Sequence, residues 1–155
     1  VDSNGTAAAV YGCPVTAPCT STTRRTVITG LDPSVFDFGS TLPDALALFA
    51  SDGANVYVSD NANQVVRVDP SGAQKTLVAG VAATAIAVDP QTNEIFLGDD
   101  GGRIARAPSD GSAPPVTIST CSGNDLVFWL AFDAQNVYAL VYEPDGSSAV
   151  YAIKR

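Results

Sequence analysis

The sequence contains no histidine and no methionine, and it has one tryptophan and three cysteines in 155 residues. Without histidine, neither a Ser-His-Asp triad nor a Cys-His pair can form, and imidazole cannot serve as a zinc ligand or as an acid–base group. The nucleophile motif Gly-x-Ser-x-Gly is also absent. The chemistry that remains is that of carboxylates, acting alone or through a hard cation such as calcium. We therefore expect no catalytic residues.

Basic residues are scarce as well. Eight Lys and Arg stand against 16 Asp and Glu, which gives a formal net charge of −8. Nucleic acid is excluded as a partner, because phosphate binding depends on an excess of Lys and Arg. The sequence has no run of eighteen apolar residues, so we expect no membrane span. An apolar content of 46% is ordinary for a globular protein. With nucleic acid and a membrane span set aside, we expect the partners of this chain to be other proteins or further copies of itself.

One short strand pattern occurs three times along the chain. The three copies are Asn55-Val-Tyr-Val-Ser-Asp60, Glu94-Ile-Phe-Leu-Gly-Asp99 and Asn136-Val-Tyr-Ala-Leu-Val141. A preceding triplet recurs with them, as Leu46-Ala-Leu48, Ile86-Ala-Val88 and Leu130-Ala-Phe132. A following apolar position recurs at Val10, Val65, Ile104 and Val150, with spacings of 55, 39 and 46 residues. A unit of about forty residues is typical of a four-stranded propeller blade.

Turn residues divide each unit into short segments. Pairs such as Asp-Gly and Asp-Pro recur between β-branched and aromatic runs, which favours four strands per unit, named a to d, and almost no helix. In the third unit we expect strands at 84–88, 94–98, 103–107 and 115–119. The sequence predicts a single all-β domain over 1–155, a β-propeller segment of about three to three and a half four-stranded blades. Its parts are 1–30 (strands c and d), an inserted loop at 31–44, then 45–80, 81–120 and 121–155, the last without its fourth strand.

The repeat resembles that of a known superfamily. Asn55-Val-Tyr-Val-Ser-Asp60 followed by Val65-Val-Arg-Val-Asp69 is similar to β-propeller repeats, in particular the NHL-like and gluconolactonase-like ones. The opening segment, from Ala9-Val-Tyr-Gly-Cys13 through Cys19, resembles cysteine-bearing repeats of exported bacterial propellers. This resemblance implies an extracellular or periplasmic location. In the lactonase-like families it also implies a metal near the central channel.

An arc of three to four blades is an incomplete ring, because propellers close with four to eight blades. Its end blades lack neighbours and its strand edges are unpaired, which invites association. We expect the ring to be closed by further chain or by oligomerisation. Two copies would supply about six units, and homodimeric closure is the hypothesis that follows.

The cysteines bear on the compartment. Cys13 and Cys19 lie between strands c and d of the first unit, where a hairpin could bring them within bridging distance, and we expect a disulfide formed in an oxidising compartment. The alternative, a metal pair, needs further Cys or His ligands. Cys121 is left over, and it is buried, free or bonded to a residue outside this chain.

Six polar residues occupy the predicted turns between strands b and c. They are Asp60, Asn61, Asp99, Asp100, Glu143 and Asp145. Because successive strands are antiparallel, the b–c turns and the d–a connections share one face of the disc. One hypothesis is that these residues bind calcium there; the other is that Asp and Asn favour turns for local reasons. No calcium-loop motif is present, so we assign no metal site.

The longest insertion lies on the same face. The loop at 31–44 carries Phe36 and Phe38, which either cover the blade beneath or form a contact surface together with the acidic turns. We expect Trp129, next to strand a of the last unit, to pack in the core or between blades. The sequence thus favours a non-catalytic extracellular scaffold for protein binding or assembly. The alternatives are a calcium-dependent, lactonase-like hydrolase and a structural subunit of an extracellular assembly.

Overall fold

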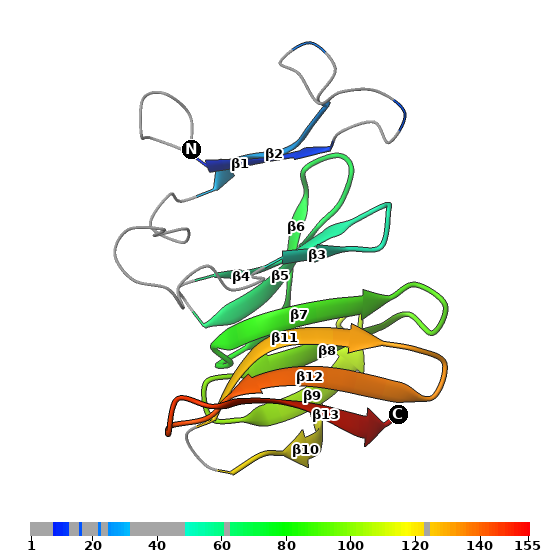
Figure 1. Cartoon of the computed structure of the whole chain (residues 1–155). Helices are drawn as coiled ribbons and strands as arrows, with labels where there is room; N and C mark the ends of the chain where they lie inside the picture. Colours follow the sequence, from blue (N-terminus) through cyan, green and yellow to red (C-terminus); the bar gives the residue numbers. More distant parts are fainter. Residues whose placement is uncertain are drawn as a thin grey trace.

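The computed structural model describes residues 8–12, 16, 22, 25–31, 49–60, 63–122 and 125–155. Within these ranges the chain forms β-strands and turns and no helix, so no described segment is an apolar helix that could cross a bilayer. The strands form four antiparallel sheets that follow one another in chain order (Figure 1). The prediction of an all-β fold built from successive small sheets is confirmed.

We call the sheets blades 1 to 4. Blade 1 consists of β1 (Ala8–Gly12) and β2 (Arg25–Leu31). Blade 2 consists of β3 (Phe49–Ser51), β4 (Val56–Asp60), β5 (Gln64–Val68) and β6 (Gln74–Ala79). Blade 3 consists of β7 (Ala83–Asp89), β8 (Glu94–Asp99), β9 (Arg103–Pro108) and β10 (Val116–Thr120). Blade 4 consists of β11 (Leu126–Phe132), β12 (Asn136–Tyr142) and β13 (Ser148–Lys154).

The strand order within each blade follows the chain, as hairpin connections require. The strands of blade 3 begin and end within one residue of the predicted ranges, because alternating apolar runs and turn residues mark them locally. Turns in the blades use left-handed backbone at several positions, for example at Asn63 in blade 2 (φ 56°) and at Gly146 in blade 4 (φ 88°). Glycine and asparagine adopt this conformation at little cost, which explains their place at these turns.

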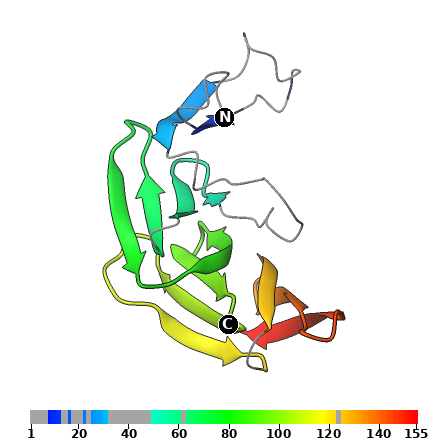
Figure 2. The ribbon, with the colours of Figure 1, turned by 90° about the vertical axis from the view of Figure 1, so that its left-hand side faces the viewer.

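The first strands of the blades lie side by side. On one side β7 contacts β3 and β4, and on the other side β11 contacts β7 and β8. Figure 2 shows the result, in which successive blades curve along an arc with their sheets stacked face to face. Blade 3 is therefore covered on both faces, by blade 2 and by blade 4.

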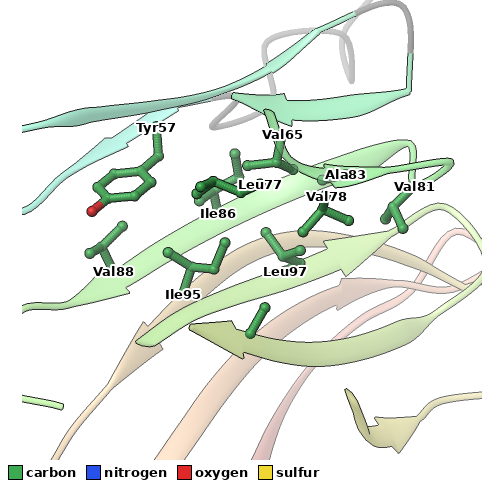
Figure 3. Packing of buried hydrophobic residues seen from close by; sticks show 11 residues of the cluster. Tyr57, Val65, Leu77, Val78, Val81, Ala83, Ile86, Val88, Ile95 and Leu97 are labelled. Carbon is green, nitrogen blue, oxygen red and sulfur yellow. The ribbon is translucent and has the colours of Figure 1, made fainter. Parts of the chain in front are cut away.

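Two apolar clusters fill the spaces between the blades. The first lies between blades 2 and 3 and is drawn in Figure 3, where side chains from both sheets point toward one another. It includes Tyr57, Val65, Leu77, Ile86, Val88, Ile95 and Leu97. The second lies between blades 3 and 4 and includes Ala85, Ala87, Phe96, Ile104, Val127, Leu130 and Val137. Neighbouring residues of β7 and β8 belong to different clusters, which is why these strands are apolar at nearly every position.

Blades 3 and 4 approach each other closely at Gly98. A Cβ atom at this position would lie 2.3 Å from Cγ1 of Val127, a residue with no exposed surface. The backbone conformation of Gly98 has no positive φ, so the requirement for glycine comes from space alone. The distance between the two sheets therefore depends on the missing side chain.

The turns between strands lie on two opposite faces of the arc, which we name the b–c face and the a–b face after the turns that they carry. The b–c face carries the b–c turns and the d–a connections, which hydrogen-bond to one another: the backbone N–H of Val81 donates to O of Asn63 at 3.0 Å, and that of Cys121 to O of Gly102 at 2.9 Å. The a–b face carries the a–b and c–d turns, and there the N–H of Ser109 donates to O of Asn93 at 2.8 Å. The antiparallel connections thus sort the turns as the sequence predicted.

Candidate functional site

Asp99 is engaged by its own turn on the b–c face. Its Oδ1 accepts hydrogen bonds from the backbone N–H groups of Gly101 (3.1 Å) and Arg103 (2.9 Å). Its Oδ2 accepts one from Nε of Arg103 at 2.9 Å, which also forms an ion pair. Asp100 beside it is exposed to solvent. The carboxylate of Asp99 therefore holds the turn in shape, which is the local role that Asp commonly has in such positions.

The equivalent turn of blade 4 shows the same pattern. Glu143 accepts hydrogen bonds from the hydroxyl groups of Ser147 (3.0 Å) and Tyr151 (2.9 Å). Oδ1 of Asp145 accepts one from the backbone N–H of Ser147 at 2.8 Å. Among the residues that the structure describes, no group of three or more Asp, Glu, Cys or His could hold a metal ion. For Asp99, Glu143 and Asp145, hydrogen bonds support the turn role.

Several predicted site residues lie outside the described residues. These are Phe36, Phe38, Asn61, Cys13 and Cys19, and for Asp60 the backbone strand is described but not the side chain. The disulfide and the contact surface on the 31–44 loop thus stay predictions. Cys121 is a free, half-buried thiol at the d–a connection. Burial, with the nearby carboxylates of Asp125 and Glu143, raises the pKa of this thiol above its usual 9.0.

The a–b face has a recurring carboxylate–tyrosine pair that sequence reasoning missed. In blade 2, Asp52 accepts hydrogen bonds from the backbone N–H groups of Ala54 (2.8 Å) and Asn55 (2.6 Å) and from the hydroxyl group of Tyr57 (2.7 Å). Burial alone would raise the pKa of Asp52, but these hydrogen bonds outweigh it and lower that pKa from 3.8 to about 2. The signal in the sequence is an Asp that precedes the repeated Asn-Val-Tyr by three residues.

Blade 4 repeats the pair at the same place. Asp133 accepts hydrogen bonds from the backbone N–H groups of Gln135 (2.7 Å) and Asn136 (2.8 Å) and from the Tyr138 hydroxyl group (2.8 Å). The hydrogen bonds from Gln135, Tyr138 and Asn136, in that order, lower the pKa of Asp133 from 3.8 to about 2. These carboxylates are therefore ionised structural acceptors at neutral pH.

In blade 3 a phenylalanine, Phe96, replaces the tyrosine, and the carboxylate finds another partner. Nη2 of Arg155 bonds to Oδ2 of the buried Asp89 and to the hydroxyl group of Thr92 (3.0 Å). The guanidinium group lies over the rings of Phe96, at 5.1 Å, and of Phe132, at 5.3 Å. A cation–π contact and an ion pair together fix blade 4 to blade 3.

Arg155 and Ser109 occupy equivalent positions in the repeat, and each lies next to the blade that precedes its own. Arg155 lies five residues beyond Val150, and Ser109 lies five residues beyond the equivalent Ile104. The Ser109 side chain lies near the Tyr57 hydroxyl group, where it acts against the rise that burial and Asp52 impose on the pKa of that tyrosine. In both cases the residue after strand c of one blade contacts the Asp–aromatic pair of the preceding blade.

A cavity of about 410 Å³ lies on the a–b face between blades 3 and 4. Its lining consists of Asp89, Pro90, Gln91, Phe132, Asp133, Ala134 and Arg155. The two carboxylates and the guanidinium group in this lining are already bonded to protein groups. The lining contains no Ser, Thr, Cys or Lys side chain.

Among the described residues, an exposed apolar surface lies on the outer face of blade 4, the face turned away from blade 3. The register pairs Trp129 with Leu140 and Leu140 with Val150, so these three side chains lie in a row across the sheet. Trp129 is 53% exposed and Val150 is 68% exposed. Trp129 therefore does not pack in the core of the described chain, which provides no sheet to cover this face, and its packing between blades stays a prediction.

Comparison with known proteins adds to the fold. No protein-family model and no curated protein matches the chain. Among solved structures, it is similar to the WD40 β-propeller domain of Doa1, with a TM-score of 0.56 and 16% identity over 68% of this chain and 37% of that one. It is also similar to the computationally designed Ika8 protein, with a TM-score of 0.51 and 19% identity over 70% of this chain and 33% of that one.

The chain spans about a third of the length of these two structures. Identities this low show the fold and no activity. The NHL-like and gluconolactonase-like resemblance stays a prediction. The stacked antiparallel sheets, two of them four-stranded, and the likeness to a WD40 propeller together show that the chain is an incomplete β-propeller.

Proposed function

We propose that this chain is a non-catalytic propeller scaffold that binds a protein partner in the extracellular space or the periplasm. The observation that carries the binding role is the outer face of blade 4, where Trp129, Leu140 and Val150 form an apolar row that no described residue covers. Large apolar patches on a soluble protein mark interaction sites, and tryptophan is enriched among the residues that dominate binding energy. The export location rests on the resemblance of the Cys13–Cys19 segment to exported propellers.

The distribution of carboxylates supports a scaffold rather than an enzyme. The described acids of the turns, such as Asp99 and Glu143, accept hydrogen bonds from their own turns. The chain has no histidine, and general acid–base chemistry would need a carboxylate free to exchange protons near neutral pH. The pKa values of about 2 for Asp52 and Asp133 are far from that range.

A site-specific photocrosslinker tests the proposal. The photoreactive residue is placed at Val150 on the outer face of blade 4 and, as a matched control, at Val116 on β10, which is 59% exposed. We expect crosslinks to a protein from position 150 in the native, exported material and none from position 116. Absence of protein crosslinks from position 150, or equal crosslinking from both positions, would contradict the proposed function.

A further inference from the structure

The connection between blades 3 and 4 buries a carboxylate where the preceding connection has an apolar side chain. Asp125 and Val81 occupy the same position in the repeat, five residues before the repeated triplets that start at Leu130 and Ile86. Val81 is 8% exposed and belongs to the apolar cluster between blades 2 and 3. Asp125 is 1% exposed. An acid thus stands at a core position of the repeat.

One oxygen of this carboxylate has no partner. Oδ2 of Asp125 accepts a hydrogen bond from the Ser122 hydroxyl group at 2.9 Å. Oδ1 is buried and has no hydrogen-bond partner, and no Lys or Arg of the described residues forms an ion pair with Asp125. A buried carboxylate without a counterion is costly, because the protein interior does not replace the hydration that it loses. An unsatisfied group of this kind indicates a bound water or ion.

A thiol lies beside this carboxylate, over the b–c turn of blade 3. A Cβ atom at Gly102 would lie 3.3 Å from Cβ of Asp125, 3.3 Å from Cβ of Cys121 and 3.2 Å from the carbonyl oxygen of Ser122. The two side chains therefore start from the same small region, with a carbonyl oxygen next to them. Cys121 is free and half-buried. A sulfur donor and an oxygen donor are thus brought together at one connection.

The surroundings of this pair are negatively charged. Burial, and then the nearby carboxylates of Asp125 and Glu143, raise the pKa of the Cys121 thiol. Arg103, the basic residue of the adjacent b–c turn, already forms an ion pair with Asp99 at 2.9 Å. Two acids and a thiol without a basic partner produce a local field that attracts a cation.

We propose that Cys121 and Asp125 bind a thiophilic divalent cation of the zinc class on the b–c face, between blades 3 and 4. Cysteine sulfur and aspartate oxygen are ordinary zinc ligands, and the ion supplies the positive charge that Oδ1 of Asp125 lacks. Binding takes the thiolate form of Cys121, so the thiol proton passes to the solvent. No third Asp, Glu, Cys or His of the described residues joins the pair, so water completes the coordination shell and the ion is exchangeable. This site is separate from the outer face of blade 4 and goes beyond the proposed function.

Calorimetric titration of the whole chain with Zn²⁺, after treatment with EDTA, tests the site. We expect one ion to bind per chain and Asp125→Asn to weaken binding at least about tenfold, the effect that even outer-shell partners of a metal have. Asp110→Asn is the matched control, because Asp110 is an exposed turn residue whose Oδ1 accepts a hydrogen bond from the backbone N–H of Ser112 at 2.9 Å. Absence of binding at about 1 mM Zn²⁺, where even a millimolar Kd is measurable, would overturn the proposal, as would equal weakening in the two variants.

Titration with Cd²⁺ identifies the sulfur ligand, since a cadmium–thiolate bond absorbs in the ultraviolet. We expect this absorption in the wild type and its loss in Cys121→Ser. Absorption that persists in Cys121→Ser would assign the ion to other cysteines and overturn the proposal. This variant tests the site independently of Asp125→Asn, and circular dichroism of both metal-free variants verifies that they are folded. The photocrosslinks at position 150 report on a different face, so failure of the metal site leaves the proposed function intact.

Discussion

The substitution Gly98→Ala tests how closely blades 3 and 4 approach each other, because it adds one methyl group between them. In Gly98→Ala the new Cβ would lie 2.3 Å from Cγ1 and 2.6 Å from Cβ of Val127, both far inside contact distance. Val127 is fully buried, so the clash can be relieved only by separating the sheets or by moving β11. Overpacking of this kind costs about 1–3 kcal/mol, and two contacts below 3 Å place the cost in the upper half, at about 2–3 kcal/mol.

Urea and thermal denaturation followed by circular dichroism give the free energy of unfolding. For a chain of this length we expect the Tm of Gly98→Ala to fall by roughly 4–12 °C, at about 2–4 °C per kcal/mol. Gly101→Ala is the matched control. Its new Cβ would meet Oδ1 of Asp99 at 3.5 Å, an ordinary contact, and Gly101 has no positive φ. We expect its stability to stay within about 0.5 kcal/mol of the wild type.

A double substitution separates the clash from a general intolerance of alanine at this strand position. Val127→Ala by itself removes two buried methyl groups, which costs about 1.6 kcal/mol in transfer free energy. In the Gly98→Ala/Val127→Ala protein the 2.3 Å contact with Cγ1 is removed, whereas the 2.6 Å contact with Cβ remains. The clash is then partly relieved, so we expect the double variant to be more stable than the sum of the two single effects predicts, by about 1 kcal/mol. Strictly additive effects, or a Gly98→Ala protein as stable as the wild type, would refute the close approach of the two sheets.

Three further predictions concern charge. Arg155→Ala leaves the buried carboxylate of Asp89 without its cation, and we expect a loss of about 2 kcal/mol or more in chemical denaturation, against no measurable loss for the exposed Lys154→Ala. The lowered pKa values of Asp52 and Asp133 add stability above the unfolded value of 3.8, which is lost as the pH falls toward 2. Acid unfolding should therefore steepen in that interval, and less so after Tyr138→Phe. Calcium should leave the Tm unchanged; a saturable rise would instead support the lactonase-like hypothesis.

The strands could be predicted from the sequence because their signals are local. Alternation in Asn136–Tyr142 and the turn residues on either side of it mark β12 without reference to any other part of the chain. The recurrence of the segment then implied a stack of similar sheets. The same local rule explains why Asp99 and Asp145 accept hydrogen bonds from their turns, which supports one of the two roles that the sequence left open.

The contacts between blades could not be predicted in this way. Arg155 and Asp89 are 66 residues apart, and no spacing rule brings them together. Trp129 has an apolar side chain in an apolar strand, yet it is exposed because the face it occupies has no described sheet against it. The described residues thus add the outer face of blade 4 as a candidate surface, beside the b–c face that the sequence predicts.

The sequence by itself determined the strands, the turns and the repeat, since backbone hydrogen bonding and side-chain alternation act over a few residues. Only the tertiary structure decided which copy of a repeated position is buried, as for Ile104, and which is open, as for Val150. The reason is physical: two residues with the same local pattern differ in exposure when a neighbouring sheet removes water from one of them and not from the other.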